Sequence, residues 1–153
     1  RIDEDTTANI GVIEGGQATN IVMPELTIKA EARSLSNEKL DKQTAHMVKC
    51  FEDAAAKFGA EIEIETARMY TAFTLEDDNE TIEIVKKACD KMGIKSKLQS
   101  TGGGSDTNVF NSKGINAVNL GVGMKKPHTL EEHISIEDLV NSARLVCSII
   151  QSV

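Results

Sequence analysis

Two neighbouring segments near the start of the chain alternate apolar and polar residues, and this pattern constrains the fold more than any other feature. Residues 8–16 (ANIGVIEGG) and 24–34 (PELTIKAEARS) have the period of half-buried strands and are bounded by glycines or proline. The link between them, GGQATN, is short enough for a hairpin. We therefore predict two paired strands.

A long helical pattern and a further alternating segment follow the hairpin. Ser36 is a candidate N-cap and Gly59 a candidate C-terminal stop for a helix over 36–59. Residues 60–70 then alternate again, with Ile62 and Ile64 on one face. The apolar positions of the helix recur at helical spacing: Leu40, Thr44, Met47, Phe51, Ala54, Ala55 and Phe58.

The order strand, strand, helix, strand matches the latter half of a ferredoxin-like βαββαβ sandwich, whose opening strand and helix would precede Arg1. Alone, such a piece leaves a sheet face and an edge poorly covered. We expect it to be incomplete, swapped or paired with another chain.

From about Thr71 the pattern becomes that of an α/β fold, so the fold class expected for the whole chain is α/β. In such sheets the loops at strand ends bind ligands. We expect a helix over 77–93, with Asp77 and Glu80 as a capping box, followed by a strand over 94–100. One or two helical turns over 108–114 and a buried strand over 115–123 come next. The last element is a helix over 134–153 that begins at Ser135. The predicted buried stripes are Ile82, Val85, Cys89 and Met92 in the first helix, and Ile136, Leu139, Val140, Ala143, Cys147 and Ile150 in the last.

Charge and composition argue against several classes of partner. The 17 basic and 24 acidic residues give a net charge of −7, which disfavours a nucleic acid or an anionic membrane. Tryptophan is absent, and the five Phe and Tyr residues leave little for stacking on bases. No apolar run approaches the length of a membrane span.

The cysteines predict the compartment. Cys50, Cys89 and Cys147 are odd in number, widely spaced and set in apolar helical patterns. We interpret them as buried free thiols in a reducing cytosol and expect a cytoplasmic protein. The chain begins RIDEDTTANIG without a methionine, which suggests the middle of a larger protein.

A glycine-rich stretch, QSTGGGSDTNVF, is the first candidate site. Gly102, Gly103 and Gly104 lack Cβ atoms and can bring N–H groups within reach of a carboxylate or an oxyanion. The alternative is a plain flexible turn, and the Lys and Ser/Thr of a phosphate loop are absent.

His128 is the second candidate. It follows Pro127 in a loop after the predicted strand 115–123, where it could bind a metal or move protons. An ordinary surface histidine is the alternative. A zinc site needs three or four protein ligands, and no HExxH motif, cysteine pair or histidine cluster is present, so any co-ligands lie elsewhere.

Arg33 ends a predicted strand, where its guanidinium could hold a carboxylate through two hydrogen bonds. An exposed ion pair is the equal alternative. Asn20, taken singly, is an ordinary turn residue, and His46 and His133 are best explained as structural. No GxSxG motif or cysteine with a neighbouring base supports a nucleophilic enzyme.

Taken together, residues 18–34, 100–110 and 119–134 resemble the corresponding segments of the dinuclear-zinc metallopeptidases, a family that includes peptidase T, aminoacylase and succinyl-diaminopimelate desuccinylase. The likeness is greatest to peptidase T-like members. It implies that residues 1–71 are the latter part of a lid or dimerisation domain and residues 72–153 the C-terminal segment of the catalytic domain. It also implies a homodimer formed through the lid.

The resemblance assigns roles to single residues. His128 matches the last metal ligand, which holds one of two zinc ions, and Glu132 matches an acid that supports the metal site from outside it. Asn20 and Arg33 match lid residues that bind the carboxylate or carbonyl of a substrate. Pro24 stands one position later than the usual proline, where this chain has Met23. Four further matches line the substrate pocket: Gly102, Gly103, Gly104 and Ser105.

The implied activity is hydrolysis of amide bonds in short peptides or N-acyl amino acids by a metal-activated water. The other zinc ligands and the general-base glutamate of the family have no counterpart in this sequence. We therefore assign no catalytic residue and expect the chain alone to be inactive and to bind zinc weakly. The alternative is a non-enzymatic dimerisation or small-ligand-binding module of the same family. Aminopeptidase, carboxypeptidase and deacylase activities all remain open.

Overall fold

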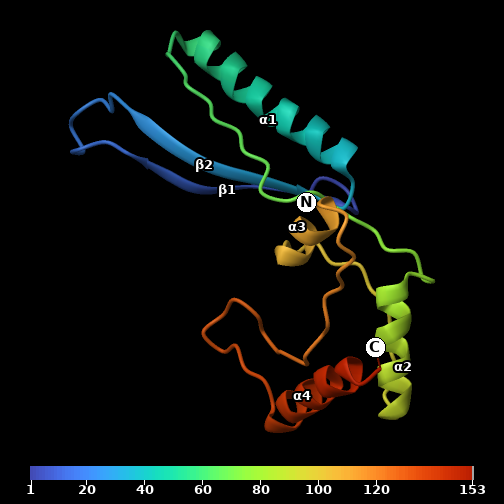
Figure 1. The fold of residues 1–153 in the computed structure, drawn as a ribbon. Helices are drawn as coiled ribbons and strands as arrows, with labels where there is room; N and C mark the ends of the chain where they lie inside the picture. The colour runs from blue at the N-terminus through green and yellow to red at the C-terminus, as the bar shows by residue number, and fades with distance from the viewer. Residues whose placement is uncertain (153) are drawn as a thin grey trace. The chain divides into compact units, whose positions relative to one another are not determined.

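A computed structural model describes residues 1–152 and shows a mixed fold of helices and strands (Figure 1). The chain divides into two compact units, each described by itself below. Unit 1 comprises Arg1–Ala72 together with Thr101–Gly104. Unit 2 comprises Phe73–Ser100 and the residues from Ser105 onward. The mixed α/β class predicted from the sequence is confirmed.

Unit 1 is built on an antiparallel hairpin of β1 (Thr6–Gly15) and β2 (Leu26–Ser34). The register pairs Thr6 with Ser34 and Gly15 with Leu26, and it shifts between Ile10 and Val12. Such a bulge bends a strand and increases its twist. The hairpin predicted from the period of two is therefore present.

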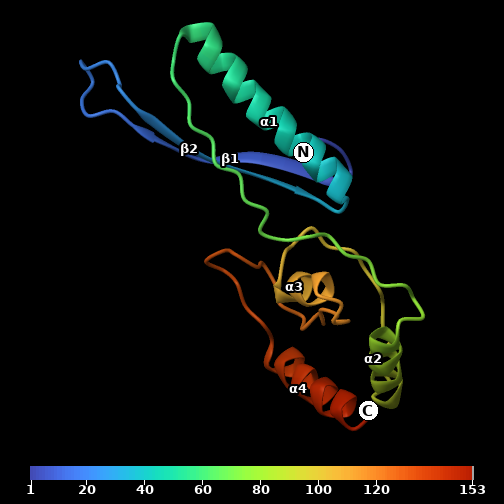
Figure 2. The ribbon, with the colours of Figure 1, turned by 45° about the horizontal axis from the view of Figure 1, so that its top comes forward.

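Helix α1 (Asn37–Phe58) follows β2 and lies beside the hairpin (Figures 1 and 2). Both predicted ends are confirmed. Ser36 Oγ accepts a hydrogen bond from the backbone N–H of Lys39, and Gly59 adopts a left-handed φ of 69°. No residue of α1 is fully buried, and Phe58 is 78% exposed, so the predicted apolar stripe is only partly covered.

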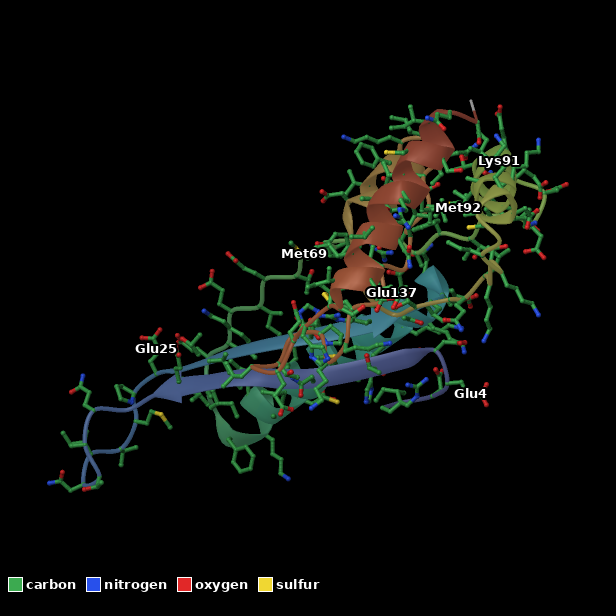
Figure 3. The ribbon with its side chains drawn as sticks, turned by 90° about the horizontal axis from the view of Figure 1, so that it is seen from below. Glu4, Glu25, Met69, Lys91, Met92 and Glu137 are labelled. Carbon is green, nitrogen blue, oxygen red and sulfur yellow. The ribbon has the colours of Figure 1, made fainter. Side chains whose placement is uncertain are left out.

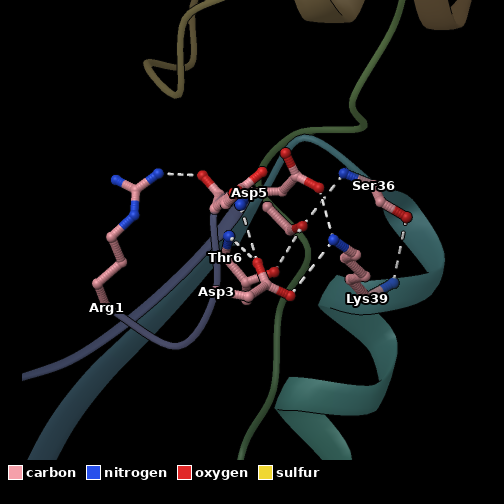
Figure 4. Close-up of polar contacts among 8 residues, drawn as sticks. Arg1, Asp3, Asp5, Thr6, Ser36 and Lys39 are labelled. Atoms are coloured by element: carbon pink, nitrogen blue, oxygen red, sulfur yellow. Dashed lines mark hydrogen bonds and ion pairs between the residues drawn. The ribbon is translucent and has the colours of Figure 1, made fainter.

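The residues before β1 are held against the start of α1 (Figure 4). Asp3 Oδ1 accepts hydrogen bonds from the backbone N–H groups of Asp5 (2.8 Å) and Thr6 (2.7 Å). Lys39 Nζ lies 3.3 Å from Asp3 Oδ2 and 2.5 Å from Asp5 Oδ2. The backbone hydrogen bond from Asp5 is the main reason why the pKa of Asp3 lies below its ordinary value.

Unit 2 contains three helices: α2 (Glu80–Lys91), α3 (Asp106–Ser112) and α4 (Ile136–Ile150). Helices α2 and α4 pack together, and Ser148 Oγ donates to the carbonyl of Ala88 at 3.3 Å. Figure 3 labels Lys91 and Met92 at the end of α2 and Glu137 in the first turn of α4. The buried apolar residues described in this unit are Ile82, Ala88 and Cys89.

Several helix predictions for unit 2 need correction. The N-cap of α2 is Asn79, whose Oδ1 accepts from Thr81 N–H at 3.0 Å, and the predicted capping box of Asp77 and Glu80 is wrong. Asn79 is better placed because its oxygen directly faces the free N–H groups of the first turn. Ser135 does cap α4. However, the expected buried stripe of α4 is open to solvent, with Ile136 83% and Ile150 70% exposed.

Three segments predicted as strands, 60–70, 94–100 and 115–123, pair with no strand among the described residues. A strand forms only where a neighbour supplies its backbone hydrogen-bond partners, and none lies beside these segments in residues 1–152. Residues 60–70 instead return along α1 without regular structure (Figures 1 and 2).

The cysteine prediction holds in part. All three thiols are free, but only Cys89 is buried, whereas Cys50 and Cys147 are exposed. Burial raises the pKa of the Cys89 thiol. None of the helices in residues 1–152 combines the length and the apolar character that crossing a membrane requires.

Candidate functional site

Arg33 lies near the end of β2, opposite Thr7 of β1. Its Nη2 lies 3.0 Å from Oε2 of Glu31, which shares its face of the strand, and both side chains are about half exposed. This hydrogen bond is the main reason why the pKa of Arg33 is raised above its ordinary value. A guanidinium carries five N–H donors, so one carboxylate neighbour leaves others open to a ligand. The substrate role of Arg33 stays a prediction.

Asn20 lies in the loop that joins β1 and β2, in a turn closed by the bond from Ile21 N–H to the carbonyl of Ala18 (3.2 Å). Arg33 is at the opposite end of the hairpin, seven residues beyond Leu26. At about 3.4 Å per residue the strand alone separates them by roughly 24 Å. Within one chain, the structure does not bring Asn20 and Arg33 to one small ligand.

Met23, which stands where the family usually has proline, packs against the base of this loop. A methyl group added at Gly15 would lie 2.6 Å from Sδ of Met23 and 2.6 Å from the carbonyl oxygen of Glu25. Gly15 therefore allows the two ends of the loop to approach closely. With methionine at position 23, a side chain lies against Gly15 at the base of the loop.

The glycine loop is exposed, and the structure separates the roles of its three glycines. None of them adopts a left-handed φ. Gly102 has open space where a side chain would start, and Gly103 N–H bonds Thr101 Oγ1 at 3.3 Å. Gly104 differs, because an added methyl group would lie 2.5 Å from Cδ2 of Tyr70. A backbone contact with a ring, and not an unusual φ, therefore requires glycine at 104.

The sequence patterns did not point to Tyr70. It is the one tyrosine of the chain, at the end of a segment whose other features are alternating acids and isoleucines. Gly104 and Tyr70 are 34 positions apart, and the contact appears only in three dimensions. No pattern in the sequence indicates that this tyrosine lies next to the glycine loop.

Ser105 is the N-cap of α3 and is held by a small polar network. Its N–H donates to Asn108 Oδ1 at 3.0 Å, and its Oγ receives a hydrogen bond from Asn119 Nδ2 at 3.1 Å. Thr107 Oγ1 also donates to Asn119 Oδ1 at 2.7 Å. The Ser105 hydroxyl is thus positioned by a residue of segment 115–123, while its substrate role stays a prediction.

His128 lies in a short loop that is closed at its base. Lys125 and His133 form an isolated antiparallel bridge with backbone hydrogen bonds of 2.8 and 3.2 Å. Inside the loop, Thr129 Oγ1 donates to the carbonyl of Lys126 at 2.9 Å. The side chains of Lys126 and Glu131 add an ion pair of 2.5 Å. These contacts join the two ends of the loop and residues within it.

Glu132 acts on the backbone of His128. Its Oε2 accepts the His128 N–H at 2.6 Å, and His128 has a φ of 63°, a value that residues other than glycine seldom adopt. The carboxylate therefore stabilises a strained backbone, and the imidazole is left exposed. The contact of Glu132 is with the main chain of His128, and its role beside a metal site stays a prediction.

His128 does not complete a metal site with its neighbours. Among residues 1–152, no group of three or more His, Cys, Asp and Glu side chains is placed to hold a metal ion. Structural and catalytic zinc sites use at least three protein ligands. The residues described here therefore do not fit a zinc ion by themselves.

The other histidines have local partners. His133 Nδ1 lies 2.7 Å from the carbonyl oxygen of Glu131, and His46 lies one helical turn from Cys50, with 3.6 Å between Nε2 and Sγ. Both partners come from the same short stretch of chain, which agrees with the structural interpretation of these residues.

The sequence pattern of peptidase family M20/M25/M40 matches residues 2–152. The chain belongs to this family. The resemblance stated from its motifs is thereby confirmed, and the family membership identifies it as peptidase-related.

Similar proteins agree with this family assignment. The chain is 50% identical over 151 residues to the uncharacterized protein YqjE of Bacillus subtilis. Among solved structures it is similar to the aminopeptidase PepT of Bacillus cereus, with 45% identity and a TM-score of 0.81. It is also similar to a tripeptidase of Staphylococcus aureus, with 39% identity and a TM-score of 0.87.

The chain spans only part of these M20/M25/M40 relatives. The YqjE match covers 99% of this chain and 41% of the relative. The match to PepT covers 99% and 41%, and the match to the tripeptidase 97% and 40%. The activity of a whole protein that contains this chain is accordingly a matter for proposal.

Proposed function

We propose that the chain is part of a zinc-dependent peptidase that hydrolyses short peptides, and that it supplies one metal ligand and part of the substrate pocket. The observation that supports this most strongly is the His128 loop. The loop is closed by the Lys125–His133 bridge, and Glu132 bonds the backbone of His128, whose exposed imidazole sits on a residue with a positive φ. Strain of this kind concentrates at functional sites.

The proposal assigns residues 1–71 to a lid domain and residues 72–153 to a catalytic segment. The boundary between the two compact units, after Ala72, supports this division. Thr101–Gly104 is the exception, since these residues group with unit 1. The outer edges of the hairpin are unpaired within residues 1–152, which leaves them open to a neighbouring strand and supports a homodimer formed through the lid.

The remaining metal ligands and the general base would come from the rest of a longer protein. Zinc would there activate a water molecule for attack on an amide carbonyl. Because residues 1–152 hold no group of three or more metal-ligating side chains, this chain alone should bind zinc weakly and should be inactive. Tight stoichiometric zinc binding by the 153 residues in calorimetry would contradict that part of the proposal.

The test of the metal role is His128→Ala in the longer protein, with His133→Ala as its matched control. His133 lies in the same loop and has its Nδ1 at a backbone carbonyl. We expect His128→Ala to lose at least half of the bound zinc, measured by mass spectrometry, and nearly all tripeptide hydrolysis. His133→Ala should keep both. Wild-type activity and metal content in His128→Ala would refute the assignment.

Arg33→Ala tests the proposed hold on the substrate carboxylate. A hydrogen bond to a charged group contributes about 1.5–3 kcal/mol, so KM for peptides with a free carboxylate should rise roughly ten- to a hundredfold. Lys29→Ala is the control, because Lys29 lies on the same strand face four residues earlier. Equal effects of the two substitutions would show that Arg33 acts only through general charge.

A non-enzymatic binding module of the same family is the second candidate. It requires no metal site, and no group of three or more metal-ligating side chains is placed together in residues 1–152. A longer protein whose upstream sequence lacks an HxD motif and a pair of adjacent glutamates, and which binds peptides without cleaving them, would establish this alternative.

A further inference from the structure

Asn119 lies where three side chains of unit 2 meet. It belongs to segment 115–123, and it contacts Ser105 and Thr107, which are 14 and 12 positions earlier in the sequence. Its Oδ1 accepts a hydrogen bond from Thr107 Oγ1 at 2.7 Å, and its Nδ2 lies 3.1 Å from Ser105 Oγ. The Asn119 side chain therefore joins the N-cap residue of α3 to the first turn of the same helix.

The distances indicate the direction of each hydrogen bond. A separation of 2.7 Å is usual for an O–H···O bond, so the Thr107 hydroxyl donates to the side-chain carbonyl of Asn119. The NH2 group of Asn119, which can only donate, then faces Ser105. Ser105 Oγ also lies 3.3 Å from Asn119 Oδ1, but this contact is longer, and the Thr107 hydroxyl already bonds that oxygen. Ser105 thus accepts from Asn119, and its own O–H can donate to another group.

A second asparagine fixes the backbone that carries Asn119. Asn111 of α3 donates from its Nδ2 to the carbonyl oxygens of Thr107 (2.9 Å) and Ala117 (2.8 Å). The N–H of Ala117 in turn donates to Asn111 Oδ1 at 3.4 Å. Ala117 lies two residues before Asn119, so the segment is held against α3 where the Asn119 side chain reaches Ser105.

The three side chains are accessible to a ligand. Asn119 is exposed, and Ser105 and Thr107 are half-buried. A hydroxyl at such a place can rotate and can bond water as a donor or as an acceptor, so burial does not require this network. Its effect is to order the Ser105 hydroxyl in one role, and an ordered donor is what binds an acceptor oxygen with the least loss of freedom.

We propose that Asn119 is a positioning residue, which holds the Ser105 hydroxyl as a hydrogen-bond donor to a carbonyl oxygen of the peptide substrate, and that Thr107 fixes the orientation of the Asn119 amide. This inference rests on the proposed peptidase function and on the substrate role assigned there to the pocket residues. The sequence motifs assign no role to Asn119 or Thr107.

The test is Asn119→Asp in the longer protein, measured as KM and kcat for one tripeptide. Aspartate has nearly the same shape and still accepts from Thr107, but its second oxygen cannot donate, so Ser105 donates to it and no longer to the substrate. KM should rise about fivefold, with kcat within about twofold of wild type, as the loss of a uniform binding contact predicts. Ser105→Ala should give the same rise. In a Ser105→Ala background, Asn119→Asp should change KM by less than about twofold, because its effect acts through the hydroxyl.

Three further variants control for charge and for folding. Asn116→Asp adds the same charge at an exposed position three residues earlier in the segment and should leave KM within about twofold of wild type. Thr107→Val removes the hydroxyl that orients the Asn119 amide and should raise KM, whereas Thr107→Ser keeps a hydroxyl there and should restore the wild-type value. The Thr107 pair tests the same proposal if Asn119→Asp does not fold.

The outcomes are distinct. An unchanged KM in Asn119→Asp, or a rise that persists in the Ser105→Ala background as a charge effect or a purely structural role predicts, overturns the positioning role while the proposed function stands. An unchanged KM in Ser105→Ala has the same consequence, since the hydroxyl then contacts no substrate. A wild-type protein that cleaves no tripeptide overturns the proposed function and, with it, this inference.

Discussion

Asn37 joins the first turn of α1 to the residue at which unit 1 ends, and its replacement gives a sharp test of the structure. The side-chain amide makes two hydrogen bonds with the backbone of Ala72, at 3.0 and 3.2 Å, and both groups are half-buried. Arg68 adds a contact of 3.4 Å to the same Asn37 oxygen. We predict that Asn37→Ala releases the segment around Ala72 from α1.

The magnitude follows from the bonds lost. A net hydrogen bond contributes about 1 kcal/mol, so loss of the bond to Ala72 N–H should speed its hydrogen exchange about fivefold, and loss of both bonds about thirtyfold. The exchange rate of this one amide is the proper assay, measured by NMR in the longer protein. A melting temperature would mislead, since alanine favours the helix over asparagine by up to about 0.7 kcal/mol and offsets part of the loss.

Two further variants complete the test. Asn37→Asp keeps an oxygen for the Ala72 N–H and loses only the donor to its carbonyl, so the amide should stay protected within about twofold. Glu38→Ala changes an exposed neighbour whose partner is Lys42 and should have no effect at Ala72. Equal exchange rates in wild type and Asn37→Ala would refute the view that this side chain holds the end of unit 1.

Two other predictions concern titrating groups. The pKa of Asp3 is lowered, chiefly by the Asp5 N–H, so Asp3 stabilises the fold above its unfolded-state pKa and loses that effect as the pH falls through its folded-state pKa. Thermal unfolding in acid should therefore depend less on pH in Asp3→Asn than in wild type, and parallel curves would contradict this. Cys89 is buried with a raised pKa, whereas Cys50 is exposed, so iodoacetamide at neutral pH should label Cys50 well before Cys89, as peptide mass spectrometry can measure. Equal labelling rates would show that the burial of Cys89 is transient.

The parts of the fold that depend on local chemistry could be predicted from the sequence. The hairpin follows from a period of two on both sides of a short glycine-containing link, and Ser36 and Gly59 set the ends of α1 through their own backbone contacts. Such local predictions can still fail by a few residues: Asp77 was predicted as the cap of α2, but the side chain of Asn79 accepts the first-turn N–H of Thr81. Local rules thus identify a helix end to within a few residues.

Some site residues could be predicted from local sequence patterns, whereas contacts between distant residues could not. His128 could be singled out because a histidine after a proline at the end of an apolar segment is a local pattern. Two contacts of unit 1 are not local in the sequence: Tyr70 meets Gly104, and Asn37 meets Ala72. No periodicity or spacing encodes these pairs, since each depends on how the chain returns along α1.

The failed predictions of strands and of buried apolar faces share one physical cause. The apolar spacing of α4 predicts a buried face, and the alternation in segments 60–70 and 115–123 predicts pairing with a neighbouring strand. The structure contains only residues 1–152, which supply neither the covering residues nor the neighbouring strands. Ile136 at 83% and Ile150 at 70% exposure, and Ile62 and Ile64 at 46% and 36%, are apolar surface that a folded domain would cover. Relatives of the family are more than twice as long as the matched region. We therefore propose that the rest of a longer protein pairs with these segments and covers α4, which would turn the sequence's strand predictions into hydrogen-bonded strands and place the His128 loop at their edge.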